Sequence, residues 1–78
     1  MNNILSYKNK NVGVLGLGMS GLAATKILSN SKANVFAFDD LKDRPSSLPK
    51  LNWIDYQNWP WLELYALVVS PGIPIHKN

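Results

Sequence analysis

The stretch Asn11-Val-Gly-Val-Leu-Gly-Leu-Gly-Met-Ser-Gly21 decides the fold of this chain, because it joins a short apolar run to a glycine pattern. Residues 11–15 are mostly apolar and stop at a glycine, which is typical of a strand buried on both faces of a parallel sheet. Gly16, Gly18 and Gly21 then fit the pattern G-x-G-x-x-G between that strand and an expected helix. The stretch therefore predicts a strand, a glycine-rich turn and the start of a helix.

The segment from Met19 to about Asn30 changes to helical spacing, which indicates an amphipathic helix. We expect its apolar face to hold Leu22, Ala23, Ile27 and Leu28, with Ser20, Thr25, Lys26 and Ser29 elsewhere. At the stop of the helix, Asn30 or Asn34 can take the left-handed backbone conformation that such a stop often needs.

Residues 35–38 form the next apolar run, which ends in Asp39-Asp40 and predicts a second buried strand beside the first. A proline-marked loop covers 43–49. We then expect a third strand over 52–56 and a fourth over 65–69. Between them, 58–63 predicts a helix with Asn58 as N-cap and Pro60 in its first turn. Alternating strands and helices predict an α/β fold: a Rossmann-like open, mainly parallel sheet with flanking helices.

Composition narrows the class of protein. Seventy-eight residues make at most one domain, and 46% hydrophobic residues indicate a folded core. The formal charge of +3 comes from scattered side chains, so nucleic acid is not an expected partner. Cysteine is absent from the sequence, and neither a secretory signal nor a membrane span is recognisable. We therefore expect a cytoplasmic protein that does not interact with membranes.

The glycine pattern carries the expected chemistry. Gly16 permits the tight turn, Gly18 lets a phosphate approach the backbone, and Gly21 lets the helix pack closely on the strand. Free amides at the helix N-terminus then favour an anion. The hydroxyl of Ser20 either adds a donor to a phosphate or caps the helix. Glycines that serve only turn and packing are the alternative.

Asp39 lies at the end of the second strand, 18 residues after Gly21, where a carboxylate conventionally meets the ligand. It could accept a hydrogen bond from a ribose 2′-hydroxyl or from the N3–H of a uracil ring, so it does not identify the ligand. Asp40 is either a second contact or a solvated turn residue. Lys42 and Arg44 could bind the 2′-phosphate of NADP only if their loop folds back toward the site.

The segment Ser70-Pro-Gly-Ile-Pro74 follows the fourth strand at the ligand-binding edge, where it could line the same crevice or form a rigid exit turn. The side chains of Trp53, Trp59 and Trp61 are expected in packing rather than in a stacking platform. His76, the single histidine, has no expected catalytic role.

Three segments together resemble the N-terminal domain of the Mur ligases, most closely that of the D-glutamate-adding ligases. They are Gly16-Leu-Gly-Met-Ser-Gly-Leu-Ala23, the aspartate that ends the second strand, and Leu67-Val-Val-Ser-Pro-Gly-Ile73. The resemblance implies binding of the UDP part of UDP-N-acetylmuramoyl-L-alanine. It implies that Met19 and Ser20 lie at the uridine and phosphates, that Asp39 and Asp40 contact the uracil, and that Ser70, Pro71 and Gly72 wall the nucleotide. Family members often carry a hydroxyl residue at the position of Asp40.

The resemblance also implies a larger enzyme of peptidoglycan synthesis, and so of cell-wall growth, cell shape and cell division. Such a ligase joins D-glutamate to a carboxylate with ATP and magnesium, using central ATP-binding and C-terminal domains. The chain contains no G-x-x-x-x-G-K-[ST] pattern. We therefore expect residues 1–78 to be an N-terminal substrate-binding fragment, truncated at its C-terminal end, monomeric, without a cofactor or metal of its own and inactive alone. The rival interpretations are an NAD- or FAD-binding oxidoreductase domain and a regulatory nucleotide sensor.

Overall fold

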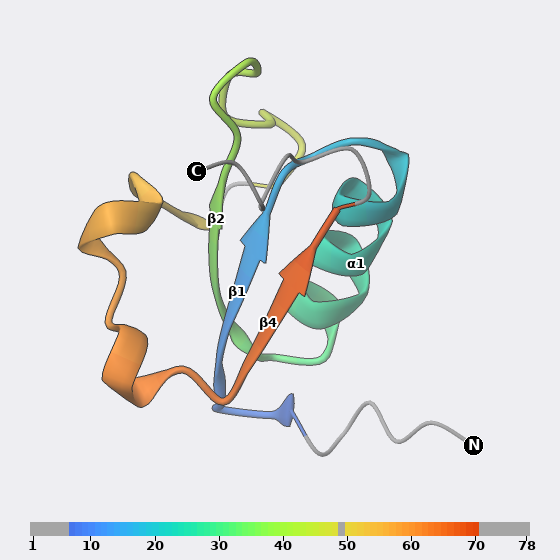
Figure 1. Ribbon diagram of the computed structural model, residues 1–78. Helices are drawn as coiled ribbons and strands as arrows, with labels where there is room; N and C mark the ends of the chain where they lie inside the picture. The colour runs from blue at the N-terminus through green and yellow to red at the C-terminus, as the bar shows by residue number, and fades with distance from the viewer. Residues whose placement is uncertain (1–6, 49, 71–78) are drawn as a thin grey trace.

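A computed structural model describes residues 7–48 and 50–70 of the chain. Four parallel strands form one sheet in the order β3-β2-β1-β4, with β1 and β2 in its centre (Figure 1). The elements follow one another as β1 (Asn11–Leu15), α1 (Met19–Asn30), β2 (Asn34–Phe38), β3 (Asn52–Trp53), the 3₁₀ turns η2 (Tyr56–Asn58) and η3 (Trp61–Glu63), and β4 (Ala66–Val69). This arrangement confirms the predicted Rossmann-like parallel sheet.

The two faces of the sheet are covered differently. Val12 pairs in register with Val35 and with Ala66. Side chains alternate between the two faces along a strand, and those on the same face as Val12 point toward α1. Gly13 belongs to the opposite face of the sheet, where the ring of Trp59 lies over it. Helix α1 therefore covers one face (Figure 1), and the segment with η2 and η3 contributes an aromatic cover to the other. Apolar side chains on and around the sheet form the core: Val12, Val14, Leu17, Leu28, Val35, Ala37 and Leu51.

Asparagine side chains fix the register at the amino ends of three strands. The Nδ2 atom of Asn34 donates to Oδ1 of Asn11 at 2.8 Å, and Nδ2 of Asn52 donates to Oδ1 of Asn34 at 2.9 Å. Because each amide both donates and accepts, the three side chains link β1, β2 and β3 in a row. The short strand β3 is thereby held beside β2 with two paired residues.

Strand β1 and helix α1 have the predicted bounds, but the buried face of α1 differs from the prediction. Gly21, Thr25 and Leu28 form it, whereas Ala23 is exposed and Ile27 is half exposed. Thr25 can be fully buried because its hydroxyl donates to the carbonyl oxygen of Gly21 at 2.8 Å. The prediction treated threonine as polar and overlooked this local hydrogen bond.

The stop of α1 also differs from the prediction. Neither asparagine takes the left-handed conformation, which falls on Lys32 with φ 67°. The helix continues to Asn30, Ser31 caps it, and the amide of Ala33 donates back to the carbonyl of Leu28 at 3.1 Å. The residue that takes the left-handed conformation is therefore determined by where the helix ends, and not by which nearby residue adopts that conformation most easily.

The segment between β3 and β4 was predicted wrongly in two respects. The third strand ends at Trp53 and does not reach residue 56, and no helix spans 58–63. Asp55 caps η2 instead of Asn58, accepting a hydrogen bond from the amide of Gln57 at 2.9 Å. The indole Nε1 of Trp59 donates to the carbonyl of Ile54 at 2.7 Å, which folds the chain back before a regular helix can form.

Candidate functional site

The ends of three strands converge on the glycine-rich turn. The amide of Gly16 donates to the carbonyl of Phe38 at 2.9 Å, and the amide of Ser70 donates to the carbonyl of Leu15 at 2.9 Å. These bonds extend the pairing of β1 with β2 and with β4 past the ends of the strands. The turn between β1 and α1 therefore lies between the residues that follow β2 and β4.

Two glycines of the turn have the predicted steric roles. Gly16 has φ 91°, a left-handed conformation that glycine adopts without penalty. A Cβ atom on Gly21 would lie 2.0 Å from the carbonyl oxygen of Gly16, so only glycine lets α1 sit this close to the turn. By contrast, a Cβ on Gly18 would meet, among the residues that the structure describes, only the Oγ atom of Ser70, at 3.3 Å. Its surroundings among these residues are therefore less restrictive than those of Gly21, since the contact is with a side-chain hydroxyl and not with backbone.

Backbone amides at the start of α1 remain available. Gly16 and Leu17 use their amides on Phe38 and on the carboxylate of Asp39. The next four amides, those of Gly18, Met19, Ser20 and Gly21, have no intramolecular acceptor within the described residues, and Gly18 makes no side-chain cap. Four unsatisfied donors at the positive end of a helix dipole form an arrangement that attracts an anion.

The predicted side chains around the turn are placed unequally. Met19 is 91% exposed and Ser20 is exposed, so both are open to a ligand over the turn. Ser70 is 8% exposed, and its Oγ faces Gly18. Two further predicted wall residues, Pro71 and Gly72, lie outside the described residues, as does His76.

Asp39 bridges two loops with its carboxylate. Its Oδ2 accepts from the amide of Leu17 at 2.7 Å, and its Oδ1 accepts from the amide of Leu41 at 2.7 Å. Partial burial raises the pKa of Asp39, but these two bonds and the charge of Lys42 outweigh it, so its net pKa is lowered. Asp39 is therefore a carboxylate at neutral pH. A carboxylate has about four lone-pair sites, so the bonds to Leu17 and Leu41 leave acceptor capacity that a ligand donor could use.

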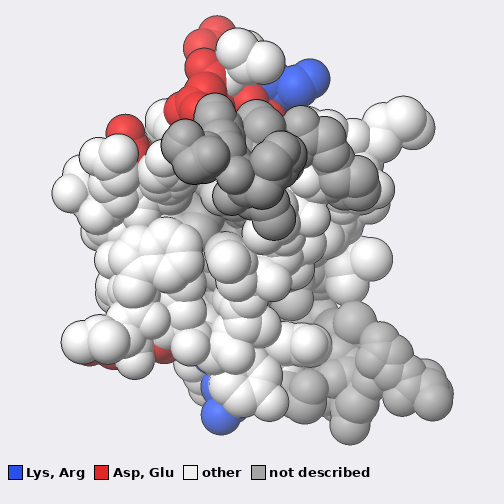
Figure 2. Space-filling view, viewed as in Figure 1, with Lys and Arg blue, Asp and Glu red and all other residues white. Residues whose placement is uncertain are grey.

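The remaining charged side chains predicted at the site are Asp40, Lys42 and Arg44. Asp40 is exposed. The guanidinium of Arg44 donates to the carbonyl of Leu51 at 3.4 Å. Acidic side chains gather at the upper end of the view in Figure 2, toward which β1 and β4 run in Figure 1, and no basic patch forms on the face shown. A Lys or Arg side chain lies beside the acidic ones at that end of the view, and the backbone amides of the turn add donors for an anion.

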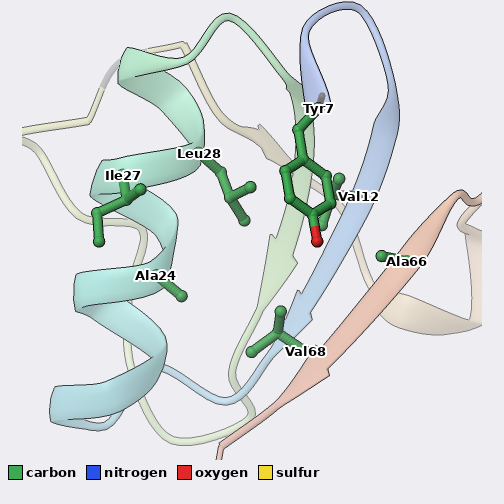
Figure 3. Close-up of a pocket in the computed structure, with 7 residues that line it drawn as sticks. All are labelled: Tyr7, Val12, Ala24, Ile27, Leu28, Ala66 and Val68. Carbon is green, nitrogen blue, oxygen red and sulfur yellow. The ribbon is translucent and has the colours of Figure 1, made fainter. Parts of the chain in front are cut away.

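An apolar hollow of about 190 Å³ lies elsewhere, between α1 and the β1–β4 side of the sheet (Figure 3). Its lining includes Tyr7, Ile27 and Val68, and apolar atoms dominate it. Such a lining gives no donors for a phosphate. Over residues 7–48 and 50–70, no three histidine, cysteine or acidic side chains gather to hold a metal ion. Nor does any helix in these ranges have the length and hydropathy to cross a membrane.

Two contacts, one under the sheet's aromatic cover and one at the turn, were not predicted from the sequence. Gly13 is needed because a Cβ there would lie 2.6 Å from the ring of Trp59. A glycine inside a strand pattern signals such a close approach, so this contact could have been suspected. The bond from the Leu17 amide to Asp39 joins residues 22 positions apart, and no local pattern predicts it.

The fold and the turn define the class of protein: a Rossmann-like domain with a glycine-rich turn and free backbone amides at the start of α1. No protein-family model matches the chain. A solved structure with TM-score 0.69 and 29% identity is the NAD-complexed form of a D-isomer specific 2-hydroxyacid dehydrogenase from Lactobacillus delbrueckii ssp. bulgaricus. The similarity covers 99% of this chain and 23% of that one.

Curated relatives give a more particular assignment. The chain is 42% identical over 92% of its length to a UDP-N-acetylmuramoylalanine–D-glutamate ligase from Wolbachia pipientis wMel. The ligases with the same name from Rhodopseudomonas palustris (strain HaA2) and Bartonella henselae are 40% and 39% identical, over 92% and 96% of the chain. The chain spans only 15–16% of the length of these relatives. Its resemblance to the N-terminal domain of the Mur ligases is confirmed.

Proposed function

We propose that residues 1–78 form an N-terminal domain that binds the UDP moiety of UDP-N-acetylmuramoyl-L-alanine. The observation that carries this proposal is the set of free amides from Gly18 to Gly21 at the start of α1. The diphosphate would accept hydrogen bonds from these amides. It would lie where Gly18 leaves the backbone uncovered.

The nucleoside would extend from the turn toward the ends of β2 and β4. Asp39 offers its remaining lone pairs to the N3–H of the uracil, and Asp40 is exposed beside it. The exposed side chains of Met19 and Ser20 would flank the ligand, with Ser70 on the other side. Contacts from Pro71 and Gly72, which lie outside the described residues, stay a prediction of the resemblance. The bonds of Asp39 to Leu17 and Leu41 fix the direction in which its carboxylate points.

The whole protein would be a D-glutamate-adding ligase, as the names of its relatives suggest. We further propose that it is cytoplasmic and monomeric and acts in cell-wall synthesis, as the resemblance to the Mur ligases implies. ATP and magnesium would bind outside this chain, because the sequence lacks a G-x-x-x-x-G-K-[ST] pattern and the described residues offer no metal ligands in a group. No catalytic step is therefore derived for these residues. The isolated chain is expected to bind substrate and to be inactive.

An NAD-binding oxidoreductase domain is the second candidate. The structural similarity to an NAD-complexed dehydrogenase favours it, and Asp39 lies where such domains meet a ribose hydroxyl. The curated relatives favour the ligase, since several share 36–42% identity with this chain under one name. We therefore rank the UDP ligand first.

Isothermal titration calorimetry with UDP-N-acetylmuramoyl-L-alanine, UDP and NAD separates the two candidates. The proposal predicts heat of binding with the muramoyl nucleotide and with UDP, and weaker or no heat with NAD. Tight NAD binding without a response to UDP would assign the site to a dinucleotide instead.

A further inference from the structure

We propose that Asp39 is a positioning residue for the glycine-rich turn, which it ties to the end of β2 so that the free amides of α1 are held ready for a diphosphate. This inference rests on the proposed function and adds a role that does not require Asp39 to touch the nucleoside. The evidence is the pair of hydrogen bonds made by its two carboxylate oxygens.

The first bond continues the connection between β1 and β2. The amide of Gly16 donates to the carbonyl of Phe38, and the amide of Leu17, one residue further, donates to the side chain of Asp39 at 2.7 Å. A hydrogen bond to a carboxylate is shorter and stronger than one between neutral groups. The turn is therefore anchored to β2 up to the residue immediately before Gly18.

The second bond orients the carboxylate itself. Oδ1 of Asp39 accepts from the amide of Leu41, two residues later, which fixes the loop that leaves β2. With one oxygen on each loop, the side chain cannot rotate without breaking a bond. Asp39 therefore links the β1–α1 turn and the β2 exit loop as one unit.

Loss of the Leu17 bond would affect all the free amides together. Leu17 is 4% exposed, so its amide would have to find water or another acceptor, and the peptide between Gly16 and Leu17, which carries that amide, would reorient. The next peptide, between Leu17 and Gly18, supplies the first of the four free donors, and its direction depends on the one before it. The consequence would reach any ligand that uses the amides, including one with no nucleoside.

Binding of inorganic pyrophosphate and of UDP to the chain and to Asp39→Asn tests this role by NMR titration. Asparagine keeps the size of the side chain but has one acceptor oxygen, so one of the two bonds is lost. We expect both ligands to lose affinity by about tenfold or more in Asp39→Asn. If pyrophosphate binding is unchanged and UDP binding falls, Asp39 only contacts the nucleoside and the inference is wrong.

Asp55→Asn is the matched control. Asp55 also accepts from the amide two residues later, but it is exposed and the described residues give it no bond to the turn. We expect its affinity for both ligands to equal that of the unchanged chain. A similar loss in both variants would show a general effect of removing negative charge, which would also overturn the inference.

The ligand-free chain gives a readout that is independent of the proposed function. As Asp39 is protonated, the amide proton shifts of Leu17 and Leu41 should change with one common midpoint, because both amides donate to its carboxylate. Lys42 is the charged side chain that acts on this carboxylate. This pH response should vanish in Asp39→Asn. A Leu17 shift that ignores pH would refute the positioning role, even if Asp39→Asn failed to fold. Absence of binding by the unchanged chain, with this response intact, would refute only the proposed function.

Discussion

The glycine-rich turn lies at the ends of the central strands, and the aromatic segment from Asp55 to Leu64 packs on one face of the same sheet. The conformation of the turn could be predicted from the sequence, and that of the aromatic segment could not. In the turn, the conformation is fixed by what glycine lacks: a Cβ on Gly21 would collide with the carbonyl of Gly16. In the aromatic segment, the conformation is fixed by what large side chains reach, such as the Trp59 indole donating to Ile54. Glycine spacing is a local sequence pattern that can be recognised. The contacts of large side chains depend on the part of the sheet against which they pack.

The largest loss of stability is expected from Gly21→Ala in the turn. The new Cβ would lie 2.0 Å from the carbonyl oxygen of Gly16. Because this oxygen is part of the backbone, the collision can be relieved only by moving α1 away from the turn. We expect a loss of about 3 kcal/mol or more in the free energy of unfolding. Urea denaturation followed by circular dichroism measures it. Lys26→Ala on the exposed face of α1 is the control, and a Gly21→Ala loss as small as that of the control would remove the packing role.

The aromatic segment should respond next, through Trp59→Ala. Trp59 is 4% exposed and lies over Gly13, so its removal opens a cavity against the sheet at a cost of about 3 kcal/mol. Trp61→Ala is matched in chemistry, but Trp61 is 44% exposed and should lose about 1 kcal/mol. Equal losses in the two variants would mean that the segment does not use Trp59 as its anchor.

Asp39→Asn should have an intermediate effect that depends on pH. The pKa of Asp39 is lowered in the folded chain, so its carboxylate stabilises the fold above its unfolded pKa, and this contribution is lost as the pH falls through the folded value. We expect the variant to lose about 1 to 2 kcal/mol at pH 7, a difference that narrows below about pH 4. Urea denaturation of both proteins from pH 7 to pH 3 measures the difference. A constant difference across this range would contradict the assignment.

Gly18→Val should affect stability least and binding most. Among the described residues the Cβ would meet only the hydroxyl of Ser70, at 3.3 Å, and a shift of that hydroxyl would relieve the contact, so we expect a loss of less than about 1 kcal/mol on folding. The side chain would nevertheless cover the free amides and weaken UDP binding by about tenfold or more. Ala23→Val places the same side chain on an exposed position of α1 and should leave binding unchanged. Parallel loss of folding and binding in Gly18→Val would reduce the glycine to a packing role.

Elements that depend on local spacing could be predicted from the sequence, whereas elements that depend on contacts between distant residues could not. The strand β1, the turn and α1 could be predicted because apolar spacing and three glycines act over a few residues. The buried state of Thr25 could not, since it depends on a hydrogen bond to Gly21. The bond between Leu17 and Asp39 and the path of residues 55–64 depend on contacts between distant segments, which a single sequence does not display.

The most direct test follows the backbone amides of Gly18, Met19, Ser20 and Gly21 by NMR while UDP is added to the chain. The account predicts that these four amide signals move most, because the diphosphate accepts hydrogen bonds from them. Signals that move only elsewhere on the chain, or that respond to NAD and not to UDP, would contradict it.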